Sequence, residues 1–162
     1  MTTHSGRNTI IFALTAVCAI ALDQAVKGLV VAFMEPGQTV TLIPRVLRIT
    51  YSTNTGGAFG LLRGSGQIVF LAALVIVVIM LAWFFWSRKH LGAWTFVGLG
   101  LIIGGALGNL VDRVFRGRVV DYIDLGWWPV FNIADLVIVA GVIITLIWYS
   151  RELWHAGGKR EP

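Results

Sequence analysis

Two aspartates in the carboxyl-terminal third of the chain, Asp121 and Asp135, each stand among apolar residues. An isolated carboxylate is costly to bury, so each group must be solvated or must pair with the other. Two carboxyl groups in contact cannot both ionise cheaply, so one keeps a proton and the pair can polarise a water for attack on an amide. The alternative is structural, with Asp135 as a charge at the start of a helix and Asp121 in a loop. These two residues alone leave both interpretations open.

A second group of polar residues has the spacing of helix faces. Asp23 and Lys27 are four residues apart with the acid first, so they share one face and can pair. Taken alone, such a pair is best explained as mutual neutralisation that lets a membrane span tolerate charge. Asn109, Asp112 and Arg113 lie on one face at the end of another helix. That is too much polarity for packing alone.

The other side chains that could act as nucleophiles or bases are poorly placed. The histidines stand near the chain ends or in a short loop: His4, His90 and His155. No helical spacing joins Ser52 to Lys27, as a serine and lysine pair would require. Cys18 is the sole cysteine and stands in an apolar span, so we expect a core residue. Asn54 precedes glycines and is well explained as a turn residue.

The composition is that of a membrane protein. Of the 162 residues, 57% are apolar and 13% are charged, and the mean hydropathy is +0.80. Ile68 to Trp86 is an unbroken apolar run of 19 residues, about the length that a helix needs to cross the hydrocarbon core. A soluble domain, intrinsic disorder and a disulfide framework are therefore excluded. The net charge of +5 comes from scattered Lys and Arg, which predicts contact with anionic membrane phospholipids and no nucleic acid partner.

Four membrane spans are predicted, at about 8–33, 67–86, 91–111 and 130–149, in a single domain over 1–162. The segment 35–66 carries two prolines, six glycines and a loose alternation of apolar residues, which predicts a small β element. The expected fold class is a mainly α membrane protein, a four-transmembrane-helix bundle with this extramembrane β element between helices 1 and 2. The amino terminus resembles a signal peptide, but the apolar pattern resumes downstream, so we expect the first span to be retained.

The charges leave the orientation in the membrane open. An even number of spans puts both termini on one side. Lys and Arg number six on each side when Lys27 is left aside, so the positive-inside rule is tied. Six of the eight acidic residues fall on the side away from the termini, which indicates that the chemistry is there. Trp127 and Trp128 are expected at that interface, and the other tryptophans at the interface near the termini.

Together these segments resemble the lipoprotein signal peptidase (signal peptidase II) family of membrane aspartic peptidases. Five motifs in the family's order carry the resemblance: Asp23-Gln24-x-x-Lys27, Asn54-x-Gly56-Gly57-Ala58-Phe59-Gly60, Gly104-Gly105-Ala106-x-Gly108-Asn109-x-x-Asp112-Arg113, Val119-Val120-Asp121-Tyr122 and Phe131-Asn132-x-Ala134-Asp135. Two departures are small. Tyr122 stands where the family mostly has phenylalanine, and the stretch between Asp121 and Asp135 is short for the family.

The resemblance implies a peptidase that cleaves prolipoproteins just before a cysteine that already carries diacylglycerol. Asp121 and Asp135 match the family's catalytic pair. The residues that match the polar lining and bracing of the pocket are Asp23, Lys27, Asn54, Asn109, Arg113 and Asn132. It also implies no metal or other cofactor, and inhibition by peptide-like antibiotics of the globomycin type. The implied location is the bacterial inner (cytoplasmic) membrane, with cytoplasmic termini and a periplasmic active site.

Two other functions fit parts of the pattern. A metal-dependent phospholipid enzyme, which chelators would inhibit, could bind Mg²⁺ through four carboxylates: Asp112, Asp121, Asp124 and Asp135. In a small transporter or structural subunit, the aspartates would relay protons or hold helices together. A transporter predicts hydropathy symmetry between the two halves, and we find no convincing symmetry. We therefore favour the peptidase.

Overall fold

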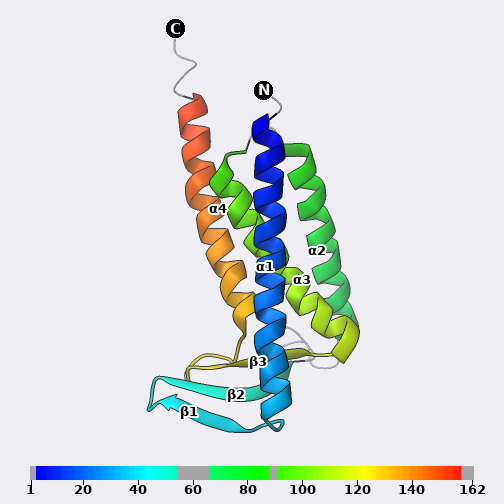
Figure 1. Ribbon diagram of the computed structural model, residues 1–162, viewed down its shortest axis with the longest axis vertical. Helices are drawn as coiled ribbons and strands as arrows, with labels where there is room; N and C mark the ends of the chain where they lie inside the picture. The colour runs from blue at the N-terminus through cyan, green and yellow to red at the C-terminus, as the bar shows by residue number, and fades with distance from the viewer. Residues whose placement is uncertain (1–2, 55–65, 88–90, 158–162) are drawn as a thin grey trace.

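The computed structural model describes residues 3–54, 66–87 and 91–157, which form four helices and three strands (Figure 1). The helices are α1 (Thr3–Phe33), α2 (Gly66–Ser87), α3 (Ala93–Arg116) and α4 (Ile133–Gly157). The strands are β1 (Thr39–Ile43), β2 (Leu47–Asn54) and β3 (Val119–Asp124). The glycine motif that follows Asn54 lies outside the described residues.

The four helices are each long and apolar enough to cross a membrane, over residues 6–33, 70–87, 93–116 and 133–151. The start of α1 and the end of α4 lie at one end of the bundle, and the sheet lies at the other (Figure 1). Many large apolar side chains on α1, α2 and α4 are exposed on the outside of the bundle, as lipid-facing side chains are. The predicted fold class is confirmed, and the chain is a multi-pass membrane protein.

Several helix ends differ from the predicted span limits, and the ends of α3 and α4 near the sheet differ for separate reasons. α3 continues to Arg116, not to residue 111, and stops at Gly117. The φ of Gly117 is 70°, the left-handed conformation that ends many helices and that glycine adopts without strain. α4 begins at Ile133, not at residue 130, because Phe131 still pairs with Ile123 in an isolated β-bridge.

The strand β3 was not predicted. The sheet has the order β1-β2-β3 and is antiparallel, so a segment that follows α3 completes the hairpin formed by residues 39–54. Nearly every β3 residue is buried, which removes the alternation of apolar and polar residues by which an exposed strand is recognised. In the register, Asp121 lies opposite Ser52. The sheet therefore carries one of the two predicted catalytic residues.

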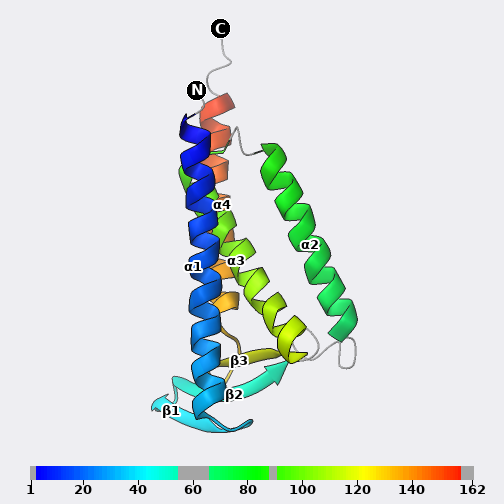
Figure 2. The same cartoon turned by 45° about the vertical axis from the view of Figure 1, so that its right-hand side comes forward.

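Glycines make α3 the centre of the bundle. A Cβ added at Gly104 would come within 2.7 Å of the Ala16 backbone oxygen in α1. A Cβ at Gly105 would come within 2.5 Å of the Ala134 backbone oxygen in α4. Small residues thus allow the backbones of α1 and α4 to come into contact with α3. α2 also packs on α3, at the edge of the bundle (Figure 2), and its Trp83 ring meets the Tyr149 ring of α4 edge to face, with ring centroids 6.2 Å apart.

The prediction for Cys18 was wrong. Cys18 is exposed on the outer face of α1, and it is Ala16 and Ala19 that face α3. In a soluble protein an apolar setting indicates burial, but in a span the lipid-facing surface is as apolar as the helix-facing one. The sequence around Cys18 therefore could not distinguish the two faces.

Candidate active site

The start of α4 is held by hydrogen bonds to each of its first four N–H groups. Such groups have no partner inside a helix and need one from elsewhere. The N–H groups of residues 133–136 donate, in order, to Tyr122 Oη, Asp23 Oδ1, Asn132 Oδ1 and the Asn132 backbone oxygen, at 3.0–3.3 Å. The Tyr122 hydroxyl, which a phenylalanine would lack, is one of these acceptors. α1 and β3 therefore fix the position of the α4 terminus.

Asn132 and Asp135 form a reciprocal cap on this terminus. Asn132 Oδ1 accepts from Asp135 N at 3.0 Å, and Asp135 Oδ2 accepts from Asn132 N at 3.2 Å. This is the geometry of a capping box, here with asparagine and aspartate. The Asp135 side chain is thereby locked to the backbone of its own helix.

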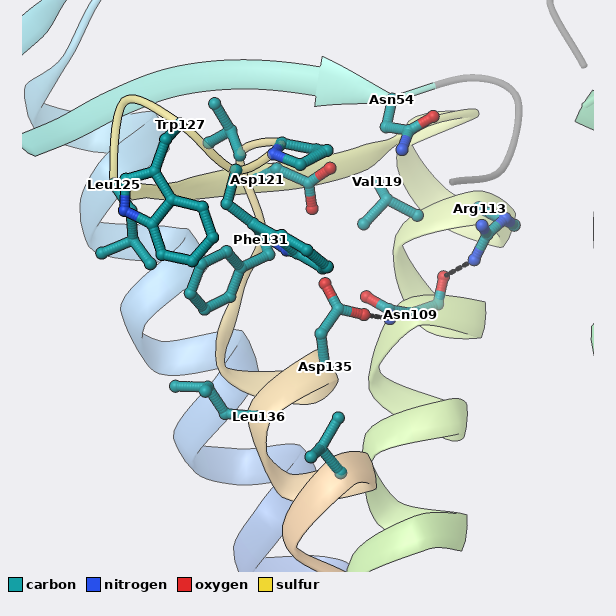
Figure 3. A pocket seen from close by; sticks show the side chains of 14 residues that line it. Asn54, Asn109, Arg113, Val119, Asp121, Leu125, Trp127, Phe131, Asp135 and Leu136 are labelled. Carbon is teal, nitrogen blue, oxygen red and sulfur yellow. Dashed lines mark hydrogen bonds between the residues drawn. The ribbon is translucent and has the colours of Figure 1, made fainter. Parts of the chain in front are cut away.

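Asp121 lies on β3, and its carboxyl group points toward that of Asp135 across a pocket (Figure 3). Its Oδ1 accepts from Asn132 Nδ2 at 2.7 Å, and the side chain of Asn54 also hydrogen-bonds to it. Only 5% of Asp121 is exposed. Asn132 therefore contacts both aspartates, one through its amide side chain and the other through its backbone.

The surroundings of Asp121 change its acidity. Burial, and to a smaller extent the nearby charge of Asp135, raise the pKa of Asp121 from 3.8 to about 7. Hydrogen bonds from Asn132 and Asn54 and the charge of Lys27 act against these two effects on the pKa. A carboxyl group with this pKa exchanges its proton near neutral pH, as a general acid or base must.

Asn109 connects the two facing aspartates, Asp121 and Asp135, to the interior of the bundle. Its Oδ1 accepts from Lys27 Nζ at 2.9 Å and from Asn132 Nδ2 at 3.1 Å, and its Nδ2 donates to Asp135 Oδ1 at 3.0 Å. An ammonium can only donate, so Lys27 requires the oxygen of this amide. The amide nitrogen of Asn109 must then face Asp135 (Figure 3).

Lys27 and two carboxylates form a fully buried ion network behind Asn109. The predicted pair is present, with Lys27 Nζ 2.8 Å from Asp23 Oδ2, and a second carboxylate, Asp112 Oδ2, lies 2.9 Å away. All three side chains have no exposed surface. Asp112 also pairs with Arg116 and accepts from the Val120 backbone N–H at 3.1 Å. This last bond ties the ion network to β3, one residue before Asp121.

The pocket itself has a volume of about 550 Å³ and two kinds of wall. The polar wall carries the facing carboxyl groups and three further side chains: Asn54, Asn109 and Arg113. Arg113 donates to the Asn109 backbone oxygen at 3.2 Å, one turn back on α3. The apolar wall comes from the loop before α4 and from its first turns: Leu125, Trp127, Trp128, Pro129, Val130, Phe131, Leu136 and Val139. A pocket of this kind suits an amphipathic ligand.

The eight predicted site residues therefore fall in two layers. The five that line the pocket are Asn54, Asn109, Arg113, Asp121 and Asp135. The other three lie behind it without exposed surface: Asp23, Lys27 and Asn132. The reasoning from sequence missed Asp112 as a partner of Lys27. Spacing indicates only the other partner of Asp112, because Arg116 follows it by four residues as Lys27 follows Asp23. The contact with Lys27 joins two helices and has no local signal.

The aspartates proposed as ligands of one Mg²⁺ do not converge. Asp112 binds Lys27 and Arg116, and Asp124 binds Arg48 on the sheet. Within the described ranges, no three His, Cys, Asp or Glu side chains are grouped as metal ligands would be. The geometry therefore does not favour the metal-dependent alternative.

Comparison with known proteins gives the family. The sequence model of the family described as Signal peptidase (SPase) II matches residues 15–151. The chain belongs to the signal peptidase II family. The lipoprotein signal peptidase of Syntrophomonas wolfei subsp. wolfei is 45% identical over 142 residues, which cover 88% of this chain and 91% of that protein. That of Halothermothrix orenii is 42% identical, with 83% and 92% covered.

Solved structures share the fold of this signal peptidase II. A bacterial membrane enzyme determined in meso at 2.3 Å aligns with a TM-score of 0.77 and 33% identity, covering 97% of this chain and 93% of its own. A second, at 1.9 Å, aligns with a TM-score of 0.72 and 34% identity, covering 88% and 91%. The family and its relatives identify the chain as a peptidase with the function of a lipoprotein signal peptidase.

Proposed function

We propose that this signal peptidase II is an intramembrane aspartic endopeptidase whose catalytic residues are Asp121 and Asp135. The observation that carries the proposal is that these two carboxyl groups face each other across one pocket, each held by hydrogen bonds (Figure 3). The raised pKa of Asp121 adds support, because a pair that keeps one proton near neutral pH can act as acid and base together.

The reaction needs one proton on the pair and one water between its members. The ionised carboxylate removes a proton from the water as the water oxygen attacks the amide carbon, and the protonated carboxyl group gives its proton to the carbonyl oxygen. The resulting diol collapses when one of its hydroxyl groups returns a proton to the ionised carboxylate, the protonated carboxyl group gives its proton to the nitrogen, and the C–N bond breaks. The products are a new carboxyl terminus and a free amine, and the pair regains its single proton. No covalent intermediate forms with the enzyme.

The neighbouring residues would set the geometry of this step. Asn109 and Asn132 each bond to a carboxylate oxygen, which leaves the pair little rotational freedom. Asn54 and Arg113 line the pocket and can contact the peptide backbone of a substrate. Asp23 and Lys27 brace the site from behind, at the α4 terminus and at Asn109.

The proposed substrates are prolipoproteins with a diacylglyceryl cysteine, cleaved just before that cysteine. A substrate anchored by two acyl chains would be met at headgroup depth, and the proposal is supported by the position of the two carboxyl groups where α4 begins and the sheet lies, at one end of the bundle. We place the protein in the bacterial inner membrane, with termini in the cytoplasm and the pocket on the periplasmic side. Membrane phospholipids surround the bundle, and peptide-like antibiotics of the globomycin type are expected to occupy the pocket.

The decisive experiment uses purified protein with a prolipoprotein peptide that either carries or lacks diacylglycerol. Mass spectrometry should show, for the lipidated peptide, a product that begins at the modified cysteine. EDTA should not change the rate, and a globomycin-type peptide should abolish it. Cleavage elsewhere in the peptide, or loss of cleavage in EDTA that Mg²⁺ restores, would reject the proposal.

A further inference from the structure

Asp124 lies outside the family motifs, yet it is one of the most extensively bonded side chains of the sheet. It is 6% exposed and accepts four hydrogen bonds. Arg48 Nε donates to Oδ2 at 3.0 Å and Arg48 Nη2 to Oδ1 at 2.9 Å, in the bidentate arrangement that makes such pairs specific. Thr50 Oγ1 donates to Oδ2 at 2.8 Å, and the Gly126 backbone N–H donates to Oδ1 at 2.8 Å.

These bonds define what we call the Arg48–Asp124 clamp, which joins β2 to the loop that follows β3. Arg48 keeps the pKa of Asp124 at about 2, so the carboxylate stays ionised at neutral pH. Gly126 has a φ of 83°, and a Cβ there would lie 3.5 Å from Arg48 Nη2. The clamp and this left-handed turn together fix the direction in which the chain leaves the sheet.

Directly after the clamp come Trp127 and Trp128. Their rings are 5.8 Å apart and cross at 70°, and 77% of Trp127 and 49% of Trp128 is exposed. Both line the same pocket as the two catalytic aspartates of the proposed mechanism. The indole of Trp127 lies on the side of that pocket where Leu125 and Phe131 are (Figure 3). Large exposed aromatic surface next to a catalytic site indicates a binding role.

The apolar wall continues outward from the tryptophans to the membrane-facing side of α4. Leu136 and Val139 line the pocket and are also exposed, at 48% and 57%. A ligand can therefore lie with its polar part against Asp121 and Asp135 and its chains along α4. Tryptophan prefers the headgroup level, where its ring is apolar and its N–H can bond to an ester.

We propose that Trp127 and Trp128 recognise the diacylglyceryl group of the substrate, and that the Arg48–Asp124 clamp is the positioning device that holds them at the pocket mouth. This inference rests on the proposed function, because it names the part of the substrate that the apolar wall receives. The clamp residues do not touch the reacting atoms. They act on the preference for a lipid anchor, not on the chemical step.

The test compares two peptides of one sequence, with either diacylglycerol or a single hexadecyl chain on the cysteine sulfur. Wild-type protein should prefer the diacylglyceryl peptide. In Trp127→Ala, Trp128→Ala, Asp124→Asn and Arg48→Met, the ratio of the two kcat/KM values should fall about tenfold, mainly through the KM of the diacylglyceryl peptide. The double variant Arg48→Met with Asp124→Asn should lose no more than either single variant, since the two residues act as one unit.

Trp86→Ala is the matched control, because Trp86 is 82% exposed at the other end of the bundle. It should leave the ratio unchanged. An equal loss for both peptides, or an unchanged ratio in the tryptophan variants, would overturn the inference. The tryptophan variants leave the clamp intact, so they test the inference even if the clamp variants fold poorly. If wild-type protein cleaves neither peptide, the proposed function fails instead, which is a distinguishable result.

Discussion

Asn132 and Asp135 hydrogen-bond to each other twice across the first turn of α4, each side chain accepting from the other's backbone N–H. The same asparagine donates its side-chain nitrogen to Asp121 at 2.7 Å. One residue therefore sets the position of both proposed catalytic carboxyl groups, and one of those groups is also part of a helix cap. Function and local stability are coupled at this terminus.

The first prediction separates these two roles of Asp135. Asp135→Asn keeps an oxygen that can accept from the Asn132 N–H, but it cannot exchange a proton. We expect a fall in turnover of about 10³-fold and a loss of thermal stability smaller than that of Asp135→Ala, because the new amide nitrogen faces the donor Asn109 Nδ2 while the helix cap is kept. Asp135→Ala should be equally inactive and also less stable, by about 1 kcal/mol, because the cap is lost. Cleavage of lipidated peptide and thermal unfolding in detergent measure the two effects.

Asp121→Asn should be as inactive as Asp135→Asn, and the double variant hardly worse, since residues that act as a unit are not additive. Both single variants should still bind lipidated substrate. Robust cleavage by either asparagine variant would remove the aspartic pair from the mechanism.

The second prediction concerns pH. The pKa of Asp121 is raised from 3.8 to about 7, so the folded state holds this proton more tightly than the unfolded chain does. Its contribution to stability is therefore complete below about pH 4 and is lost as the pH rises to about 7. Asp121→Asn does not titrate. Its melting temperature should therefore rise relative to that of wild type as the pH increases from about 4 to about 7. Wild-type turnover should decline as the pH rises through about 7. A stability difference that is constant with pH would contradict this assignment.

The third prediction is that Lys27 stabilises the fold and takes no part in proton transfer. Lys27→Met leaves Asp23 and Asp112 buried without their shared cation. Removing one partner of a buried ion pair typically costs about 3–5 kcal/mol, so the amount of folded protein and its melting temperature should drop. The additional change Asp23→Asn should recover part of that stability. A Lys27→Met protein of normal stability but without activity would argue for a direct catalytic role.

The fourth prediction tests the contact of α3 with α4. Gly105→Ala places a methyl group 2.5 Å from the Ala134 backbone oxygen, so the helices must separate at the turn that carries Asp135. Both thermal stability and turnover should fall. Gly28→Ala is the matched control, because a Cβ at Gly28 meets nothing within 4 Å. It should be neutral or stabilising by up to about 1 kcal/mol. Equal effects of the two changes would show that the contact between α3 and α4 tolerates a methyl group.

The fifth prediction concerns orientation. In a Cys18→Ala background, single cysteines at Thr41 or Val46 on the sheet side should react with an impermeant thiol reagent applied to intact spheroplasts. A cysteine at Gly6 should not react until the membrane is permeabilised. All three positions are exposed in the structure. Labelling of Gly6→Cys alone in intact spheroplasts would reverse the proposed topology.

The helices were predictable because each span is a long apolar run, and the pair of Asp23 with Lys27 because its spacing is local. β3 was not predictable, since it is buried on both faces and its partner β2 is far away in sequence. The Arg48–Asp124 clamp was hidden for the same reason, because 76 residues separate its members. The lipid-facing position of Cys18 was missed because a bilayer removes the contrast between inside and outside.

The ion network has a consequence for how the protein enters the membrane. Its three groups, together with Arg116, form two pairs, Asp23 with Lys27 on α1 and Asp112 with Arg116 on α3, and each pair lies within one helix. Each of these acid–base pairs can therefore be neutralised within its own helix, before the other helix has been synthesised. When α1 and α3 meet, Lys27 keeps its contact with Asp23 and gains a second one with Asp112. Neutralisation within each helix and later docking of the two helices thus use the same four residues.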